Sequence, residues 1–279
     1  MPGTISPEQN AERKSNVIEK ILHYVWLGPD EIPDGSAALI RGWERLHPGW
    51  QIKKWDESNF DCRGNAWVEA AMTRKNFSLA ADIIRSYALL NEGGVYLDTD
   101  VELIKPLDTL AEDYDFFIGF ETGLWFGCAV LGARRGHPIM REVFLRYLSP
   151  CGKVDAHTNM LCVLNFSASI KRLYPSVALN GRTQKIGENA AIFAADWFFP
   201  KHYITRNTTI TGNTVAIHHY TSTWWPVGKR VGRRIAKTIR LILGESFFSL
   251  FERIARFRML GRLNREYHRR CKGASANGA

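Results

Sequence analysis

The chain has 279 residues, of which 45% are hydrophobic and 23% are charged, a composition typical of globular proteins. This length suffices for one large α/β domain, or for one domain with a tail. The net charge of +9 is concentrated near the C-terminus. Residues 229–272 carry 14 Lys and Arg against three Glu, which leaves 23 basic and 25 acidic residues elsewhere. A folded domain without excess positive charge is not expected to bind nucleic acid.

Cysteine usage and apolar runs indicate the compartment. Five cysteines are scattered without a C-x-x-C pair, which is typical neither of a disulfide framework nor of a zinc site, so a reducing compartment is expected. Residues 1–20 are polar and lack the apolar region of a signal peptide. The chain contains no stretch of about 18 apolar residues, so no membrane span is predicted. These features favour a cytoplasmic location.

The N-terminal elements predict a parallel sheet. Residues 21–27 form a short apolar run that Gly28 and Pro29 end, as expected of a buried strand. A helical pattern follows at 34–46, and a second strand is expected at 50–55. Strand, helix and strand in about 35 residues indicate a βαβ unit.

A second helix is predicted over residues 77–92, with an apolar stripe at helical spacing. Gly93 and Gly94 supply a stop, since a helix often ends on a residue with positive φ. Residues 95–97 then form a strand with Asp98 and Asp100 at its C-terminal end, the edge of an open α/β sheet where ligands bind.

The rest of the chain divides less sharply. Further strands are expected at residues 115–120, 128–131 and 215–218, and further helices at 138–148 and about 158–173. We predict three parts: a polar N-terminal segment (1–20), an α/β domain (21–228), and a basic amphipathic helical tail (229–279).

Asp98 and Asp100 are the strongest candidates for chemistry. In an extended segment, residues two apart point to the same side, so both carboxylates can face one site. Neighbouring carboxylates repel unless a cation lies between them, and hard oxygen ligands favour Mg²⁺ or Mn²⁺. The alternative is a solvated turn, because D-x-D often occurs by chance.

Asp82 and Arg85 lie three residues apart on the helix that precedes this strand. They could form a surface ion pair of little consequence. Their helix must, however, pack against the strand that leads to Asp98, which would bring the pair near the same sheet edge.

The run from Ala81 to Asp100, ADIIRSYALLNEGGVYLDTD, resembles the signature of the DXD-containing sugar-binding-region glycosyltransferases, glycosyltransferase family 32, which the clostridial glucosylating toxins share. Three further segments are similar to the family's conserved elements: HYVWLG at 23–28, HPGW at 47–50 and HHYTSTW at 218–224. The resemblance covers residues 21–225 and implies a GT-A-type α/β fold and retaining transfer from a nucleoside diphosphate sugar. No protein base is implied, because the departing phosphate oxygen is thought to help deprotonate the acceptor.

The resemblance also implies roles for individual residues. Asp100 would bind Mn²⁺ or Mg²⁺ directly, and Asp98 would bind the donor's ribose and sugar side, or the metal through water. The remaining roles are donor-sugar binding by Asp82 and Arg85, donor contact by Tyr96, base stacking by Trp26, closure over the diphosphate by Ser222 and Trp224, and completion of the metal shell by His218 or His219. By sequence alone, Trp26 in an apolar strand is more typical of a core residue, and only the resemblance makes base stacking an equal alternative. The two histidines could equally be metal ligands or core residues.

The basic tail alternates Lys and Arg with apolar and aromatic residues. Such a helix suits the surface of an anionic membrane, which fits a lipid-linked acceptor on the inner face of the cell membrane. The alternative is that its apolar residues pack back on the domain.

The favoured function is therefore a retaining transferase that uses a UDP-sugar, or GDP-mannose, and a glycan or glycolipid acceptor in polysaccharide or lipopolysaccharide synthesis. Alternatives are a translocated effector that glycosylates a host protein, a metal-dependent nucleotidyl or phosphoryl transferase, and a non-catalytic, membrane-peripheral sugar-nucleotide-binding protein. The chain lacks a P-loop motif.

Overall fold

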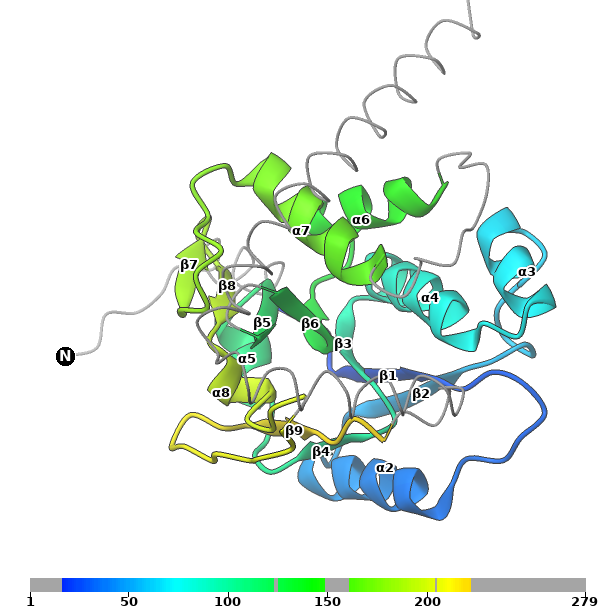
Figure 1. Cartoon of the computed structure of the whole chain (residues 1–279), viewed down its shortest axis with the longest axis horizontal. Coiled ribbons are helices and arrows are strands. Elements are labelled where there is room, and N and C mark those ends of the chain that lie inside the picture. Colours follow the sequence, from blue (N-terminus) through cyan, green and yellow to red (C-terminus); the bar gives the residue numbers. More distant parts are fainter. Residues whose placement is uncertain (1–16, 123–124, 149–160, 204, 222–279) are drawn as a thin grey trace, which may run out of the picture.

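A computed structural model of the chain describes residues 17–122, 125–148, 161–203 and 205–221 (Figure 1). The polar N-terminal segment (almost entirely) and the basic tail lie outside these residues. Within them, no helix is long and apolar enough to cross a membrane.

The main sheet has seven strands in the order β2-β1-β3-β6-β5-β8-β7, and β4 and β9 form a second, two-stranded sheet. The strands are β1 (Ile21–Val25), β2 (Gln51–Trp55), β3 (Gly94–Leu97), β4 (Val101–Leu103), β5 (Phe116–Thr122), β6 (Trp125–Ala133), β7 (Gln184–Ile186), β8 (Ala190–Phe193) and β9 (Ala216–His218). The main sheet is mixed: β1 is parallel to β2 and β3, whereas β6 is antiparallel to β3 and β5.

Helices cover both faces of this sheet (Figure 1). They are α2 (Asp34–Leu46), α3 (Ala66–Thr73), α4 (Phe77–Glu92), α5 (Asp108–Asp113), α6 (Pro138–Leu148), α7 (Leu161–Leu173) and α8 (Ala195–Phe198). Residues of α3, α4, α6 and α7 form one hydrophobic core with the sheet. Residues of α2, α5 and α8, together with the small sheet, form a second core on the other face.

The sequence predictions for the central elements are confirmed. The helices α2, α4 and α6 have the predicted bounds, and β1 and β2 pair in parallel as a βαβ unit requires. Helix α7 begins at Leu161, and residues 158–160 of the predicted helix lie outside the described residues.

Two glycines allow α4 to turn tightly into β3. Gly93 ends the helix with φ +69°, and Gly94 follows with φ +104°, conformations that L side chains rarely adopt. A Cβ at Gly94 would lie 2.6 Å from the Ile21 carbonyl oxygen. The turn therefore holds α4 directly against β1 and β3, which fixes the position of the side chains that α4 carries.

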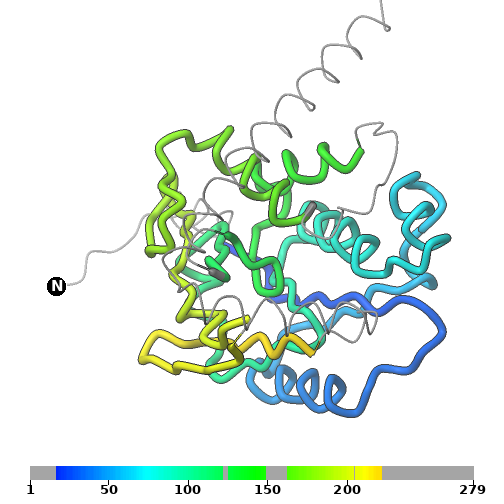
Figure 2. The backbone as a smooth tube through the Cα atoms, in the orientation of Figure 1, coloured from blue at the N-terminus to red at the C-terminus, as the bar shows by residue number. Residues whose placement is uncertain are grey.

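The small sheet brings the C-terminal part of the described chain back to the end of β3. Strand β4 follows β3 closely and pairs antiparallel with β9, with Val101 opposite His218. Figure 2 shows the late segment, in yellow, beside the much earlier one. Residues more than a hundred positions apart thus meet at one sheet edge.

Candidate active site

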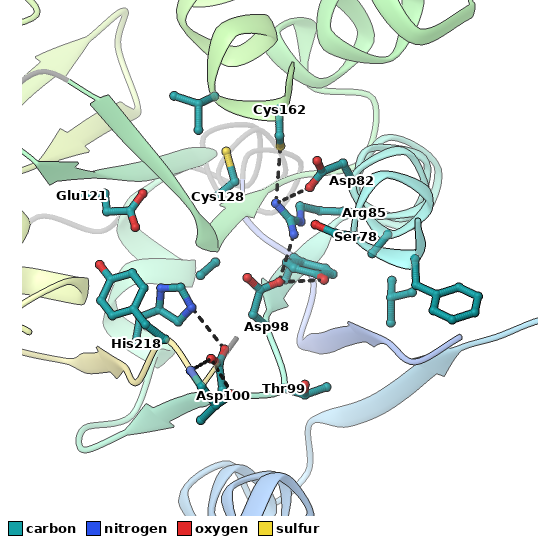
Figure 3. A pocket seen from close by; sticks show the side chains of 18 of the residues that line it. Ser78, Asp82, Arg85, Asp98, Thr99, Asp100, Glu121, Cys128, Cys162 and His218 are labelled. Atoms are coloured by element: carbon teal, nitrogen blue, oxygen red, sulfur yellow. Dashed lines mark hydrogen bonds and ion pairs between the residues drawn. The ribbon is translucent and has the colours of Figure 1, made fainter. Parts of the chain in front are cut away.

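A pocket of about 250 Å³ opens at the edge where β3 ends (Figure 3). Its lining includes four of the predicted catalytic residues and two predicted contacts: Asp82, Arg85, Asp98, Asp100, Tyr96 and His218. The residues come from α4, from the end of β3 and from β9. The sequence-based prediction that α4 carries side chains to the D-x-D edge is therefore confirmed.

Arg85 is the centre of a buried polar cluster on one wall. Its Nη2 donates to Asp98 Oδ1 at 2.9 Å, and its Nη1 lies 3.3 Å from Asp82 Oδ1. The Tyr96 hydroxyl donates to the same Asp98 oxygen at 3.0 Å, and the guanidinium carbon lies 4.2 Å from the Tyr96 ring centroid. The Arg85 side chain is only 5% exposed. The alternative of a surface ion pair between Asp82 and Arg85 is therefore wrong.

Burial gives Asp82 and Arg85 different electrostatic behaviour. Loss of solvent raises the pKa of Asp82 to about 6, although Arg85 opposes that shift. Burial alone would lower the pKa of Arg85, but Tyr96 and Asp98 outweigh it and raise that pKa above its usual range. Arg85 thus remains a cation, whereas Asp82 titrates near neutral pH.

Asp98 and Asp100 both face the pocket because they lie in a turn, and not because they alternate along an extended strand. Strand β3 ends at Leu97, and the Val101 amide donates to the Asp98 carbonyl oxygen at 3.0 Å. The prediction of an extended D-x-D segment is therefore corrected. The turn is not the solvated one considered as an alternative, because the Asp100 side chain is only 13% exposed.

Asp100 is held by the returning chain. Its Oδ1 lies 3.1 Å from His218 Nε2, and its Oδ2 accepts from the Thr221 amide at 2.7 Å and from the Thr221 hydroxyl at 3.0 Å. Burial raises the pKa of Asp100, but the bonds from His218 and Thr221 outweigh it and lower that pKa to about 2. Burial lowers the pKa of His218, and the bond to Asp100 raises it overall.

The two neighbouring histidines point to different surroundings. His218 is the last residue of β9, and successive residues of a strand face opposite sides. His219 Nε2 lies 2.8 Å from Glu102 Oε2, and His219 is not among the residues that line the pocket. Of the two histidines predicted as metal ligands, only His218 therefore lies in the pocket. The position of His219 does not support a role as a ligand.

Asp98, Asp100 and His218 fit a divalent cation. Each offers one ligand atom, and the three atoms all lie within 4.8 Å of one another. Two carboxylate oxygens and one imidazole nitrogen are a donor set that suits Mn²⁺ and accommodates Mg²⁺. The sequence-based prediction of a metal site at this edge therefore agrees with the geometry, while the identity of the ion stays a prediction.

Trp26 lies on the other side of β1. Val25 and Leu27 line the pocket, whereas Trp26 packs in the core of the α2 face and is 7% exposed. Its indole nitrogen donates to the Asp30 carbonyl oxygen at 2.7 Å. Base stacking by Trp26 stays a prediction that this arrangement does not support. The other predicted closing residues, Ser222 and Trp224, lie outside the described residues.

The sequence reasoning missed part of the lining. Glu121 ends the apolar run of β5, and its pKa is raised mainly by burial. Tyr220 and Thr221 follow the histidine pair, and Cys128 and Cys162 lie beside the Arg85 cluster (Figure 3). One signal was available: a glutamate that ends an otherwise apolar strand stands out at a ligand-binding edge.

Comparison with known proteins agrees with this geometry. Residues 33–117 match the family described as "Glycosyltransferase sugar-binding region containing DXD motif". Inositol phosphoceramide mannosyltransferase 3 of Schizosaccharomyces pombe is 29% identical over 134 residues, which cover 47% of this chain and 37% of that protein. Subversion of eukaryotic traffic protein A of Legionella pneumophila is 21% identical over 129 residues, which cover 36% of this chain and 20% of that protein.

A solved structure shows the same fold. The structure titled PaToxG Glycosyltransferase has a TM-score of 0.50 at 14% identity, and the match covers 60% of this chain and 75% of that one. The fold of the described residues is therefore of the GT-A type. Within that fold, residues 33–117 are similar to the DXD-containing sugar-binding region of glycosyltransferases. It spans less than half the length of the curated relatives that it matches.

Proposed function

We propose that the chain transfers a hexose from a nucleoside diphosphate sugar to a hydroxyl group of a glycan or glycolipid, with a divalent cation and with retention of configuration. The observation that carries the proposal is the cluster of Asp98, Asp100 and His218 beside the buried Asp82 and Arg85 pair. A cation site next to hydrogen-bonding groups for a sugar suits a substrate that joins a pyrophosphate to a sugar ring.

Asp98, Asp100 and His218 would hold the Mn²⁺ or Mg²⁺ ion, which neutralises charge on a departing diphosphate as a Lewis acid. Arg85 fixes Asp98 through the 2.9 Å bond, so this carboxylate is oriented before a ligand arrives. Asp82, when ionised, accepts from a donor-sugar hydroxyl. Thr221 fixes Asp100 through its other carboxylate oxygen, while His218 contacts Asp100 until the cation takes its place.

Two classes of donor, which differ in the sugar and in the nucleoside base, are candidates. UDP-sugars are the first choice from the resemblance of the sequence. The curated relatives named as inositol phosphoceramide mannosyltransferases favour mannose, and hence GDP-mannose. A glycolipid acceptor agrees with the same names.

The match to subversion of eukaryotic traffic protein A favours a second candidate, an effector that modifies a host protein. An acceptor survey that compares lipid-linked sugars with protein side chains separates the two. The survey is repeated after deletion of residues 229–279, because association of that tail with an anionic membrane is part of the first proposal. Loss of lipid acceptor use upon deletion, with donor hydrolysis retained, supports a membrane-peripheral enzyme on the inner face of the membrane.

A thermal-shift screen tests the proposal itself. UDP-, GDP- and CMP-sugars are each added with and without Mn²⁺, and a ligand at 100 times its Kd adds about 2.7 kcal/mol to the stability. We expect one nucleotide class to raise the melting temperature only when Mn²⁺ is present. A melting temperature that no sugar nucleotide changes, in either condition, would contradict the proposed function.

A further inference from the structure

Glu121 lies at the same sheet edge as Asp98 and Asp100, although it belongs to a different strand. Strands β3 and β5 are both antiparallel to β6, so their C-terminal ends lie at the same edge. Asp98 and Asp100 follow β3, and Glu121 is the last residue but one of β5. The edge that carries the predicted metal ligands thus presents a third carboxylate from a different strand.

A β-bulge directs this side chain. In the β5–β6 pairing, Phe120 is opposite Phe126 and Thr122 is opposite Trp125, so Glu121 is the extra, unpaired residue between them. Bulges re-aim side chains and are common beside active sites. Figure 3 shows Glu121 on the His218 side of the pocket, away from Asp82 and Arg85.

Glu121 differs from the other two carboxylates in its neighbours. Asp98 is bound by Arg85, and Asp100 by His218 and Thr221. Among the described residues, Glu121 forms no ion pair with a Lys or Arg, and the groups that favour its charged form are His218 and the Tyr220 hydroxyl, which hydrogen-bonds to it. Its carboxylate is therefore not committed to a fixed cation, which leaves it able to accept hydrogen bonds from a ligand.

The surroundings of Glu121 combine this carboxylate with aromatic rings. Tyr220 packs edge-on against Tyr203 with ring centroids 5.3 Å apart, and both line the pocket together with Phe199. The C–H face of a sugar ring packs against aromatic rings, while its hydroxyl groups bond to a carboxylate. This half of the pocket thus matches a polyhydroxylated ring.

Charge decides which reactant this half receives. A diphosphate is attracted to the site of Asp98, Asp100 and His218, where a cation fits, whereas the Glu121 side has no Lys or Arg in an ion pair with its carboxyl group among the described residues. The uncharged partner of the reaction therefore suits the Glu121 side.

We propose that Glu121 and Tyr220 form the acceptor subsite, and that Glu121 accepts hydrogen bonds from the hydroxyl groups of an acceptor sugar or cyclitol ring. This inference rests on the proposed function, because an acceptor subsite requires a donor in the other half. It adds the chemical class of the acceptor and the residues that bind it.

Donor hydrolysis in the presence of small ring acceptors tests the inference. The full chain hydrolyses the sugar nucleotide selected by the thermal-shift screen, and release of nucleotide is followed as methyl α-mannopyranoside, methyl α-glucopyranoside or myo-inositol is added. A ring that enters the subsite either raises nucleotide release by accepting the sugar or lowers it by displacing water. In either case, the measured quantity is the half-effect concentration, which is the concentration of added ring that gives half of the maximal change in nucleotide release.

We expect Glu121→Gln to raise this concentration about tenfold or more, because a site built to bond hydroxyl groups loses much when its acceptor is changed. The KM of the donor should change less than about twofold, since the Arg85 cluster is untouched. Tyr220→Phe should also raise the half-effect concentration of the ring. It replaces Glu121→Gln as the test variant if Glu121→Gln does not fold. The matched control is Glu102→Gln, a carboxylate on β4 that bonds to His219 and does not line the pocket.

Three outcomes overturn the inference: no response of the wild-type chain to any ring, an unchanged half-effect concentration in both variants, or an equal change in Glu102→Gln. Each of these leaves the proposed function intact as long as the donor is bound and hydrolysed. Failure of the wild-type chain to bind any donor counts instead against the proposed function.

Discussion

The two walls of the pocket hold their aspartates by different chemistry. The wall built from α4 and β3 surrounds Asp98 with a permanent cation, Arg85, and a buried tyrosine hydroxyl. The wall built from the returning chain holds Asp100 with a titratable histidine and with Thr221. Asp98 is thus oriented without any ligand, whereas Asp100 and His218 form a pair whose bond a cation would replace. Under the proposed function, the first wall would position the donor, and the Asp100–His218 pair of the second wall would rearrange when the metal binds.

Removal of Asp100 should have the largest effect. Asp100→Ala deletes one of the three clustered ligand atoms, and loss of Lewis-acid stabilisation costs several kcal/mol, so metal-stimulated turnover should fall by about 1000-fold. The fold should persist because the residue lies in a turn after β3. Turnover and circular dichroism measure the two effects, with Glu102→Ala as the control. Metal-stimulated turnover within about tenfold of wild type would place the ion elsewhere.

The first wall is tested by Arg85→Met. This change leaves two carboxylates, Asp82 and Asp98, without their cation in a buried place, which should destabilise the fold by about 3 kcal/mol and weaken donor use by about 2 kcal/mol or more. Urea unfolding and donor kcat/KM provide the two values. Arg85→Lys retains a cation and should lose less stability. Donor hydrolysis equal to that of wild type in a folded Arg85→Met chain would remove Arg85 from the site.

The neighbouring histidines sharpen the comparison further. His218→Ala should weaken Mn²⁺ activation by about 10-fold or more, because its Nε2 belongs to the cluster of ligand atoms. His219→Ala is the matched control, since that ring bonds to Glu102 instead. The Mn²⁺ concentration for half-maximal activity is measured for both. Equal shifts in the two variants would contradict the assignment of His218 as the ligand.

The smallest effect concerns the titration of Asp82. A pKa of about 6 in the folded chain, against an ordinary 3.8, means that the folded state binds this proton more tightly than the unfolded state. The associated stability is fully present at low pH and is lost as the pH rises through about 6. Relative to Asp82→Asn, the unfolding free energy of wild type should fall by roughly 1 to 2 kcal/mol between about pH 5 and about pH 7.5. A relative stability that rises with pH would show that Arg85 outweighs burial.

The same two walls differ in what could be predicted from sequence. Asp82 and Arg85 lie on α4, and Asp98 directly follows β3, to which two glycines join that helix, so helical spacing and the stop signal placed them together. The bounds of α2, α4 and α6 were predicted for the same reason: long periodic patterns with clear ends.

Elements that depend on distant partners were missed. Strand β4 has three residues and exists because it pairs with β9, and the short β7 and β8 likewise complete the far edge of the main sheet. Glu121 reaches the pocket through a bulge in a pairing that no local pattern specifies. His218 and His219 were indistinguishable because only the register of β9 against β4 decides which one faces Asp100.

Calorimetry of sugar-nucleotide binding tests the central claim most directly, namely that a cation held by the D-x-D turn recruits the donor. The donor chosen by thermal shift is titrated into the full chain with Mn²⁺, with Mg²⁺ and with EDTA, and the series is repeated with Asp100→Asn. We predict binding heat in the presence of either cation, none with EDTA, and at least a tenfold weaker metal-dependent affinity in the variant. Equal affinity with and without the cation in the wild-type chain would contradict the account.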